Sequence, residues 1–302
     1  MKRTLRAADG RRLSTQVYGD PDGRPVFLLH GTPGSRLGPH PRSAVLHRLG
    51  VQLISFDRPG YGESDRVEGR NVADAASDVL TIADALDLER FAVVGRSGGG
   101  PHALACAALL PHRMTKAAVL VGIAPHGADG LDWFDGMAQS NVAEFEAAAS
   151  SYEDIVAHTK ELASAIRADP ASLIARLQSE LPESDRRVVA DQGIRSKLVE
   201  TYAEALRTSD YGWVDDALAF CSPWGFDPTT VTVPVLLWHG DGDVFSPASH
   251  ARWLASRIPN ATVVVQAGAA HFGALDVLPD ILRWVSAGPP APGRLVDMDS
   301  AG

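Results

Sequence analysis

The sequence has little cysteine, no excess of positive charge and no long apolar run, and each lack removes a class of protein. Two cysteines among 302 residues, Cys106 and Cys221, cannot build a disulfide scaffold or a cysteine-rich metal site, and we expect both to be buried free thiols. The formal net charge of −9 disfavours a nucleic-acid partner, which would need a basic face. No uncharged apolar stretch approaches the ~18 residues of a membrane span. We therefore expect neither a nucleic-acid partner nor a membrane partner.

The N-terminus, Met1 to Arg6, is basic, but charged and polar residues follow it in place of an apolar segment. We therefore expect no secretory signal peptide and a cytoplasmic location. A composition of 45% hydrophobic and 22% charged residues is typical of a globular protein. The length allows one α/β core with an insertion, or two domains. No sequence pattern indicates the oligomeric state.

Apolar strand patterns alternate with helical patterns in the first 124 residues. Residues 4–18 alternate around an Asp9-Gly10 turn, which predicts a hairpin at a sheet edge. Further strands are predicted at 26–29, 51–56, 91–94 and 117–123, and helices at 41–49, 71–86 (with Asn71 as N-cap) and 103–110. Strands that alternate with helices on short connections indicate a mostly parallel, doubly wound sheet, so the expected fold class is α/β.

The alternation stops after Ala124. Residues 125–230 show helical patterns and no convincing strand, and one helix is predicted to open with a capping box at Ser151-x-x-Asp154. This region predicts a helical cap inserted over the sheet. The α/β pattern then resumes with strands at 234–238 and 262–265 and helices at 248–258 and 275–285. The expected domains are a core of 1–124 and 231–287, a cap of 125–230 and a disordered tail of 288–302.

Ser97 stands in Gly95-Arg-Ser97-Gly-Gly99, between a strand pattern and a helical pattern. This is the context of the G-x-S-x-G nucleophile elbow. Such a sharp turn brings the residues at −2 and +2 together, so both must lack a Cβ. It also leaves the Gly98 N–H at the start of a helix, where it can stabilise an oxyanion. The motif alone is weak evidence, because a glycine-rich turn can hold an incidental serine.

Four further motifs follow strand ends, where such sheets place their ligands. They are His30-Gly-Thr-Pro-Gly34, Asp57-Arg-Pro-Gly-Tyr-Gly-Glu-Ser64, Gly240-x-x-Asp243-x-x-x-Pro247 and His271. With the serine motif they give the order Ser, Asp, His, which is that of α/β-hydrolases. On these residues the chain resembles the α/β-hydrolase superfamily from about residue 4 to 287, with the helical cap as its variable part.

Chemistry assigns the roles within this constellation. The Ser97 hydroxyl is a poor nucleophile until a base accepts its proton, and His271 is the predicted base. A buried carboxylate must orient that imidazole, and Asp243 is the predicted residue. Asp241 is an alternative, but the family pattern that ends in Pro247 favours Asp243.

The predicted oxyanion hole combines the Gly98 N–H with a second donor, which the resemblance assigns to Thr32, because Pro33 has no N–H. Asp57 and Arg58 are expected to pair with each other. Four other histidines are rival bases that we interpret as structural or packing residues: His30, His102, His126 and His239.

Large apolar side chains gather in the cap and its facing loops, and some of them are expected to line a substrate pocket. The pocket candidates are His30, Arg96, Trp133, Phe134, Trp213 and Trp224. Phe220 and Phe226 belong to the same group of aromatic residues, some of which are expected to pack the cap against the sheet. An apolar pocket beside the triad predicts a serine hydrolase without cofactor or metal. Its expected small-molecule substrate is a largely apolar ester, lactone or related acyl compound, cleaved through an acyl-serine intermediate.

Two alternatives remain open. The His30-Gly-Thr-Pro-Gly34 motif is similar to that of proline iminopeptidases, although those enzymes typically have a second glycine where Thr32 stands. An aminopeptidase would need cap carboxylates for the substrate ammonium, and Glu144, Glu146 and Glu153 are candidates. The other alternative is carbon–carbon bond hydrolysis or lyase chemistry, or a non-catalytic small-molecule binding protein, on the same fold. Because the predicted nucleophile is a serine, we do not expect the dehalogenase or epoxide-hydrolase activity of the superfamily members that use an aspartate.

Overall fold

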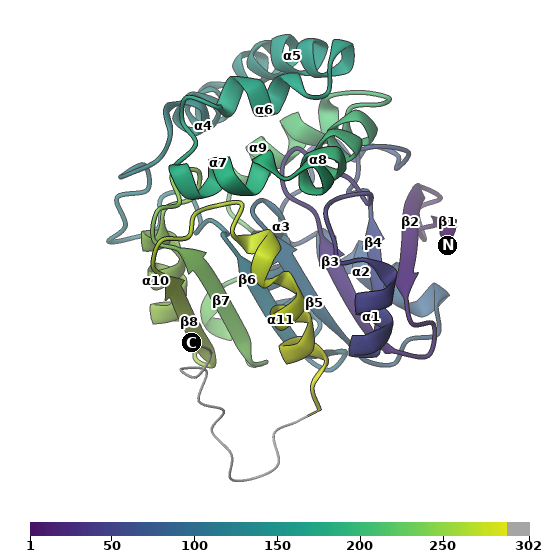
Figure 1. The fold of residues 1–302 in the computed structure, drawn as a ribbon. Coiled ribbons are helices and arrows are strands. Elements are labelled where there is room, and N and C mark those ends of the chain that lie inside the picture. The colour runs from purple at the N-terminus through teal and green to yellow at the C-terminus, as the bar shows by residue number, and fades with distance from the viewer. Residues whose placement is uncertain (289–302) are drawn as a thin grey trace.

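An eight-stranded sheet forms the centre of the molecule in the computed structural model, which describes residues 1–288 (Figure 1). The strands lie in the order β1-β2-β4-β3-β5-β6-β7-β8. β1 and β2 form the predicted antiparallel hairpin, β2 pairs antiparallel with β4, and every other pairing is parallel. The strands are Lys2–Arg6, Arg12–Gly19, Arg24–Leu29, Val51–Phe56, Phe91–Arg96, Met114–Leu120, Val235–Gly240 and Ala261–Gln266. The predicted mostly parallel, doubly wound sheet is confirmed.

Helices cover both faces of the sheet, which explains the uninterrupted apolar strands. Along β3, Phe27 and Leu29 join one hydrophobic core, whereas Val26 and Leu28 join the other. A strand that is buried on both faces needs apolar residues at every position. Helices α1 (Ser43–Leu49) and α11 (Ala274–Ser286) cover one face, and α2 (Ala75–Ala85), α3 (Gly99–Leu109) and α10 (Ala248–Arg257) cover the other.

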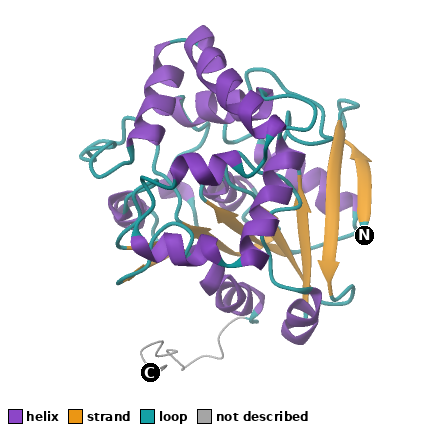
Figure 2. Cartoon of the chain, turned by 45° about the horizontal axis from the view of Figure 1, so that its top comes forward, coloured by secondary structure: helices purple, strands orange, loops and turns teal. Residues whose placement is uncertain are grey.

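Six helices lie in sequence between β6 and β7, and we call residues 125–230 the cap. They are α4 (Gln139–Ser150), α5 (Tyr152–Ala168), α6 (Ser172–Leu177), α7 (Glu183–Ala190), α8 (Gln192–Ala205) and α9 (Tyr211–Cys221). The cap stands over the ends to which the parallel strands run, and Figure 2 shows its helices in front of the sheet. Its hydrophobic cluster includes Ile166 and Leu198 and extends to Tyr61 and Phe272 of the α/β domain.

The predicted start of one helix is wrong, and the predicted cap of another is confirmed. The helix expected from Asn71 begins only at Ala75, because residues 72–74 form turns before it. The Asn71 side chain still accepts a hydrogen bond from the Asp74 N–H at 3.3 Å. Ser151 does cap α5, since its side-chain oxygen accepts a hydrogen bond from the Asp154 N–H at 3.1 Å. Of the expected disordered tail, 288–302, residues 289–302 lie outside the described residues.

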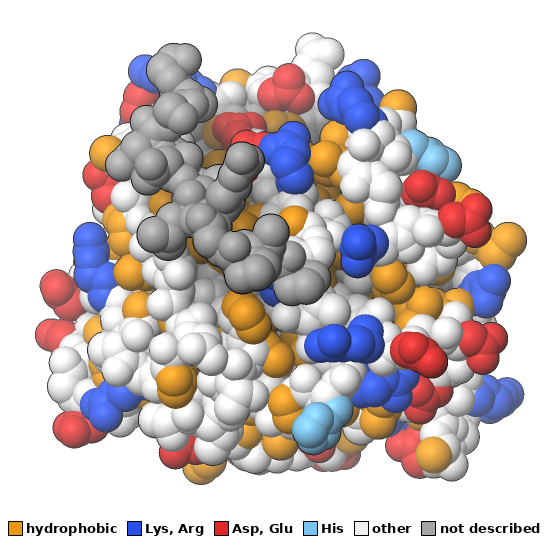
Figure 3. All heavy atoms as spheres, turned by 90° about the horizontal axis from the view of Figure 1, so that it is seen from below, with side chains coloured by type: hydrophobic (Ala, Val, Ile, Leu, Met, Phe, Trp, Pro, Cys, Tyr) orange, Lys and Arg blue, Asp and Glu red, His pale blue; other side chains and the backbone are white. Residues whose placement is uncertain are grey.

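The described residues contain no helix that is long and apolar enough to cross a membrane. The face opposite the cap shows basic and acidic side chains intermixed where it is visible (Figure 3).

Candidate active site

Ser97 occupies a strained turn between β5 and α3. Its φ of 53° lies in the left-handed region that non-glycine residues rarely adopt. A Cβ at Gly95 would stand 2.2 Å from the Gly99 carbonyl oxygen, and one at Gly99 would stand 2.2 Å from the Leu29 oxygen. The two glycines that flank the serine are therefore in the close contact that the motif predicts. The turn leaves the Ser97 side chain on the wall of a cavity.

His271 and Asp243 meet beside this turn. His271 Nδ1 lies 2.9 Å from Asp243 Oδ2 and 3.1 Å from Oδ1. Burial by itself would raise the pKa of Asp243, but His271 and His239 outweigh it and hold that pKa below its usual value. Asp241 instead accepts a hydrogen bond from the exposed Gly268 N–H. The structure thus brings Asp243, and not Asp241, to His271, while Ser97 and His271 line the same cavity.

The backbone N–H groups of Thr32 and Gly98 lie near Ser97 and are free. A Cβ at Gly98 would stand 2.3 Å from Thr32 Oγ1, so the two residues are close neighbours. A Cβ at Gly31 would stand 3.3 Å from that of Ser97. Neither the Thr32 N–H nor the Gly98 N–H is hydrogen-bonded to another described residue. This is the arrangement of free donors that an oxyanion hole requires.

A buried aspartate of the cap holds the Thr32 loop. Asp216, on α9, accepts hydrogen bonds from the Thr32 hydroxyl at 2.6 Å and the Tyr61 hydroxyl at 2.9 Å. It also pairs with Arg58 at 2.5 Å and Arg70 at 2.7 Å. Burial would raise the pKa of Asp216, but Arg58 and Arg70 bring it well below its usual value. One carboxylate thereby ties the cap to the loop that carries Thr32.

The expected pairing of Asp57 with Arg58 is wrong. Asp57 accepts hydrogen bonds from the backbone N–H and the guanidinium of Arg36. The Arg58 side chain turns to Asp216 and also donates to the carbonyl oxygens of His30 and Gly31. Neighbours along an extended segment point in different directions, so adjacency in sequence did not bring these two charges together.

A second cap aspartate holds the histidine loop. Asp185, on α7, is fully buried and accepts the backbone N–H groups of His271 at 3.1 Å and Phe272 at 2.8 Å. Sequence reasoning missed both Asp185 and Asp216. For Asp185 the available signal was weak, because an aspartate on a charged helix normally faces solvent. Asp216 offered a signal, since it stands among the apolar residues of Tyr211–Cys221, where a carboxylate needs a buried partner.

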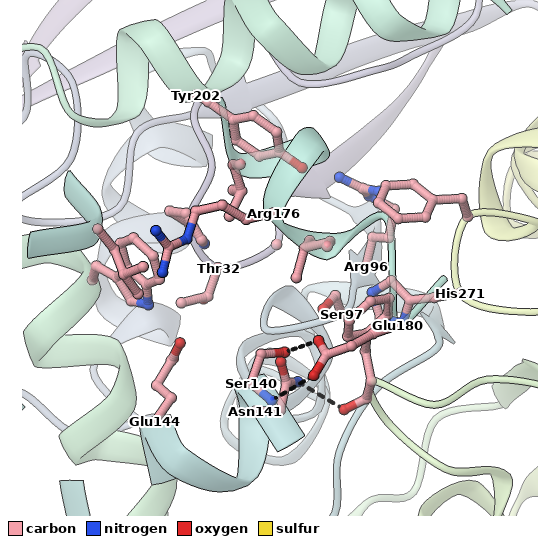
Figure 4. Close-up of a pocket in the computed structure, with 18 of the residues that line it drawn as sticks. Thr32, Arg96, Ser97, Ser140, Asn141, Glu144, Arg176, Glu180, Tyr202 and His271 are labelled. Carbon is pink, nitrogen blue, oxygen red and sulfur yellow. Dashed lines mark hydrogen bonds between the residues drawn. The ribbon is translucent and has the colours of Figure 1, made fainter. Parts of the chain in front are cut away.

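The cavity between cap and core has a volume of about 300 Å³. Ser97, His271 and Thr32 lie on its wall (Figure 4). Contrary to the expected apolar lining, four charged side chains also face it: Arg96, Glu144, Arg176 and Glu180.

Among the six predicted pocket residues, only Arg96 and Trp213 line this cavity. Trp133 donates its indole N–H to the Ala124 oxygen and packs on Phe145, and Phe134 packs on Trp133. The other two, His30 and Trp224, are also buried away from the cavity, where His30 bonds the loop backbone and Trp224 packs on Phe226. The prediction was wrong for His30, Trp133, Phe134 and Trp224, because these side chains fill the interior.

The rival bases do not line the cavity either. His102 lies 3.4 Å from Asp216, His239 lies 3.4 Å from Asp243, and His126 packs on Trp133. Both cysteines are free, Cys106 buried and Cys221 only half-buried. Among residues 1–288, no cluster of His, Cys, Asp and Glu has the arrangement of a metal site.

A sequence profile described as the alpha/beta hydrolase fold matches residues 24–276. The chain therefore belongs to the alpha/beta hydrolase family, as its motifs predicted. It is 27% identical over 283 residues to a non-heme chloroperoxidase of Streptomyces lividans, covering 93% of this chain and 96% of that protein. It is 33% identical over 130 residues to a proline iminopeptidase of Xylella fastidiosa (strain 9a5c), covering 42% of this chain and 41% of the other.

The fold is also that of solved structures. The chain resembles the crystal structure of an esterase from Rhodococcus sp. ECU1013 with a TM-score of 0.63 and 22% identity, covering 94% of this chain and 96% of that one.

Proposed function

We propose that the protein is a serine hydrolase that cleaves an ester, lactone or related acyl bond of a small molecule. The observation that supports this most is the convergence on one cavity of Ser97, of His271 bonded to Asp243, and of Thr32, whose free amide belongs to a residue next to Gly98. Each group has a required role in acyl transfer, and membership of a hydrolase-fold family agrees with it.

The proposed reaction follows from these positions. His271 Nε2 takes the proton of the Ser97 hydroxyl as its oxygen attacks the substrate carbonyl. The N–H groups of Thr32 and Gly98 stabilise the resulting oxyanion. His271 then gives its proton to the leaving alcohol, and water cleaves the acyl-serine by the same steps. Asp243 keeps Nδ1 protonated and balances the imidazolium charge.

A second candidate, aminopeptidase activity, is favoured by one residue. Glu144 lines the cavity and forms no ion pair with another described residue, whereas Glu146 and Glu153 are exposed. Burial raises the pKa of Glu144 to about 7, although the Trp213 indole lowers it somewhat. A substrate ammonium beside Glu144 would favour the charged carboxylate.

One set of assays separates the two functions. The values of kcat/KM are compared for p-nitrophenyl esters of two to eight acyl carbons and for prolyl-2-naphthylamide, on one preparation. Acyl transfer predicts faster ester hydrolysis, nearly unchanged in Glu144→Gln. Prolyl-amide turnover that is lost in Glu144→Gln and kept in Glu146→Gln would place the aminopeptidase first. Hydrolysis of neither class would count against both.

A further inference from the structure

Arg96 is half-buried and differs from the buried arginines of this protein in its contacts. Arg36, Arg58 and Arg70 each pair with an aspartate: Arg36 with Asp57, and both of the others with Asp216. The Arg96 guanidinium forms no hydrogen bond or ion pair with any residue from 1 to 288, although it lies at the end of β5, next to Ser97, and lines the cavity. A half-buried cation without a partner is costly, so it calls for an explanation.

Tyr202 lines the same cavity as this cation. Figure 4 shows the ends of Arg96 and Tyr202 turned toward one another across the cavity wall. The Tyr202 hydroxyl also forms no hydrogen bond within the described part of the chain, although the residue is 6% exposed. Burial lowers the pKa of Arg96, and the neighbouring Tyr202 counteracts this only in part. A guanidinium and a hydroxyl thus present unused donors to one space.

The acidic side chains of the cavity do not neutralise Arg96. Both oxygens of Glu180 are bonded to Ser140, to its N–H at 3.0 Å and to its hydroxyl at 2.5 Å. Glu144 projects from α4 and forms no ion pair with Arg96. Arg176, on α6, adds a second cation that pairs with no described residue. The donors that remain free for a ligand are therefore mainly those of cations.

We propose that Arg96 and the Tyr202 hydroxyl bind a carboxylate of the substrate, so that the substrate is an ester or lactone whose acyl part carries a negative charge. The proposal rests on the serine hydrolase function above. Because Arg96 and Ser97 line the same cavity, one bound molecule can place its carboxylate on Arg96 and its scissile bond at Ser97. The planar guanidinium can donate two parallel hydrogen bonds to a carboxylate, and the Tyr202 hydroxyl a third.

The turnover test uses two esters of equal shape. Monomethyl glutarate carries a carboxylate, and methyl 4-carbamoylbutanoate replaces it with a neutral amide. Methanol release should show the wild type at least tenfold faster in kcat/KM on the anionic ester. Arg96→Gln should lose about 30-fold or more on that ester alone, as expected for a buried charge pair that loses one partner. Arg96→Lys should recover part of the loss, and Tyr202→Phe should show a smaller one.

One further variant and two contrary outcomes set the limits of this test. Arg176→Gln removes the other cavity cation and should reduce turnover of the anionic ester less than Arg96→Gln does. Equal turnover of the two esters by the wild type would overturn the proposal. So would an Arg96→Gln variant that loses both activities alike, since that would make Arg96 a support of the serine turn.

A binding test separates this proposal from the hydrolase function. Calorimetry with glutarate on Ser97→Ala should detect binding that is lost in Ser97→Ala combined with Arg96→Gln. If glutarate binds in this Arg96-dependent way while the wild type hydrolyses no ester, the anion site holds and the hydrolase proposal fails. Absence of glutarate binding would overturn the site. Tighter Arg96-dependent binding of inorganic phosphate would overturn the choice of carboxylate.

Discussion

The core and the cap each contribute buried aspartates to the site, and these aspartates do different work. Asp243, on a core loop, contacts the imidazole of His271 directly. Asp185 and Asp216, on cap helices, contact the loops that carry His271 and Thr32. In the proposed reaction the core thus supplies the groups that react, and the cap holds the loops of two of them. The comparison teaches that the cap supports the candidate site as well as covering the cavity.

The largest effect should come from the core aspartate. Asp243→Asn removes the charge that orients His271 and should lower kcat on the order of 10⁴-fold. Asp241→Asn is the matched control two residues away and should change kcat less than threefold, because Asp241 bonds only the Gly268 N–H. Steady-state kinetics on one ester measures both variants. Equal losses would contradict the assignment of Asp243.

The second largest effect should come from Asp216 of the cap, whose loss should lower both the stability and the rate. Asp216→Asn leaves Arg58 and Arg70 with no full counter-charge and should lower the free energy of unfolding by about 3–5 kcal/mol. It should also lower kcat on the order of 10²-fold with KM little changed, because the oxyanion loop is less well held. Asp215→Asn is the control, since the Asp215 carboxylate, next to Asp216 in the chain, pairs with Arg66 and not with Thr32.

Thr32→Val tests the same link without removing a charge. It keeps the Thr32 N–H but loses the hydroxyl that donates to Asp216. We expect a loss of kcat of about tenfold that does not add to that of Asp216→Asn, as is usual for groups in one network. Thr32→Ser should restore the rate. Fully additive losses would show that Asp216 does not act through Thr32.

The smallest effect concerns Glu144 and pH. Burial raises the pKa of Glu144 to about 7, so the folded protein holds this proton more tightly than the unfolded chain does. The free energy of unfolding therefore falls as pH rises from about 4.3, the usual pKa of a glutamate, to about 7. Glu144→Gln lacks the fall, so its free energy of unfolding relative to wild type should increase by about 2–3 kcal/mol from pH 5 to pH 8.

Urea unfolding at the two pH values measures this difference. Glu146→Gln, an exposed position on the same helix, serves as the control and should show no such trend. A Glu144→Gln variant whose relative stability is the same at both pH values would mean that Glu144 is solvated in the folded protein.

The core site could be predicted from sequence because its determinants are local. Gly95 and Gly99 are required by the turn at Ser97 itself, and Asp243 belongs to a short motif that begins at Gly240. The mostly parallel sheet likewise follows from the alternation of strand and helix patterns. Each of these features depends on residues that are near one another in the chain.

The cap site could not be predicted in the same way, because its contacts join distant segments. Asp216 lies 184 residues from Thr32, and nothing near either residue in sequence indicates that they meet. Trp133 and Trp224 are the large apolar residues that a pocket often uses, yet here they fill the interior. Which face of a cap helix turns to the cavity depends on how six short helices pack.

Covalent labelling with a fluorophosphonate tests the central claim most directly. The protein is incubated with the reagent, digested, and the modified residue is identified by mass spectrometry. We expect one adduct, on Ser97, absent from a folded Ser97→Ala variant and formed far more slowly by Asp243→Asn. An adduct on another residue, or equal labelling of Ser97→Ala, would contradict Ser97 as the nucleophile.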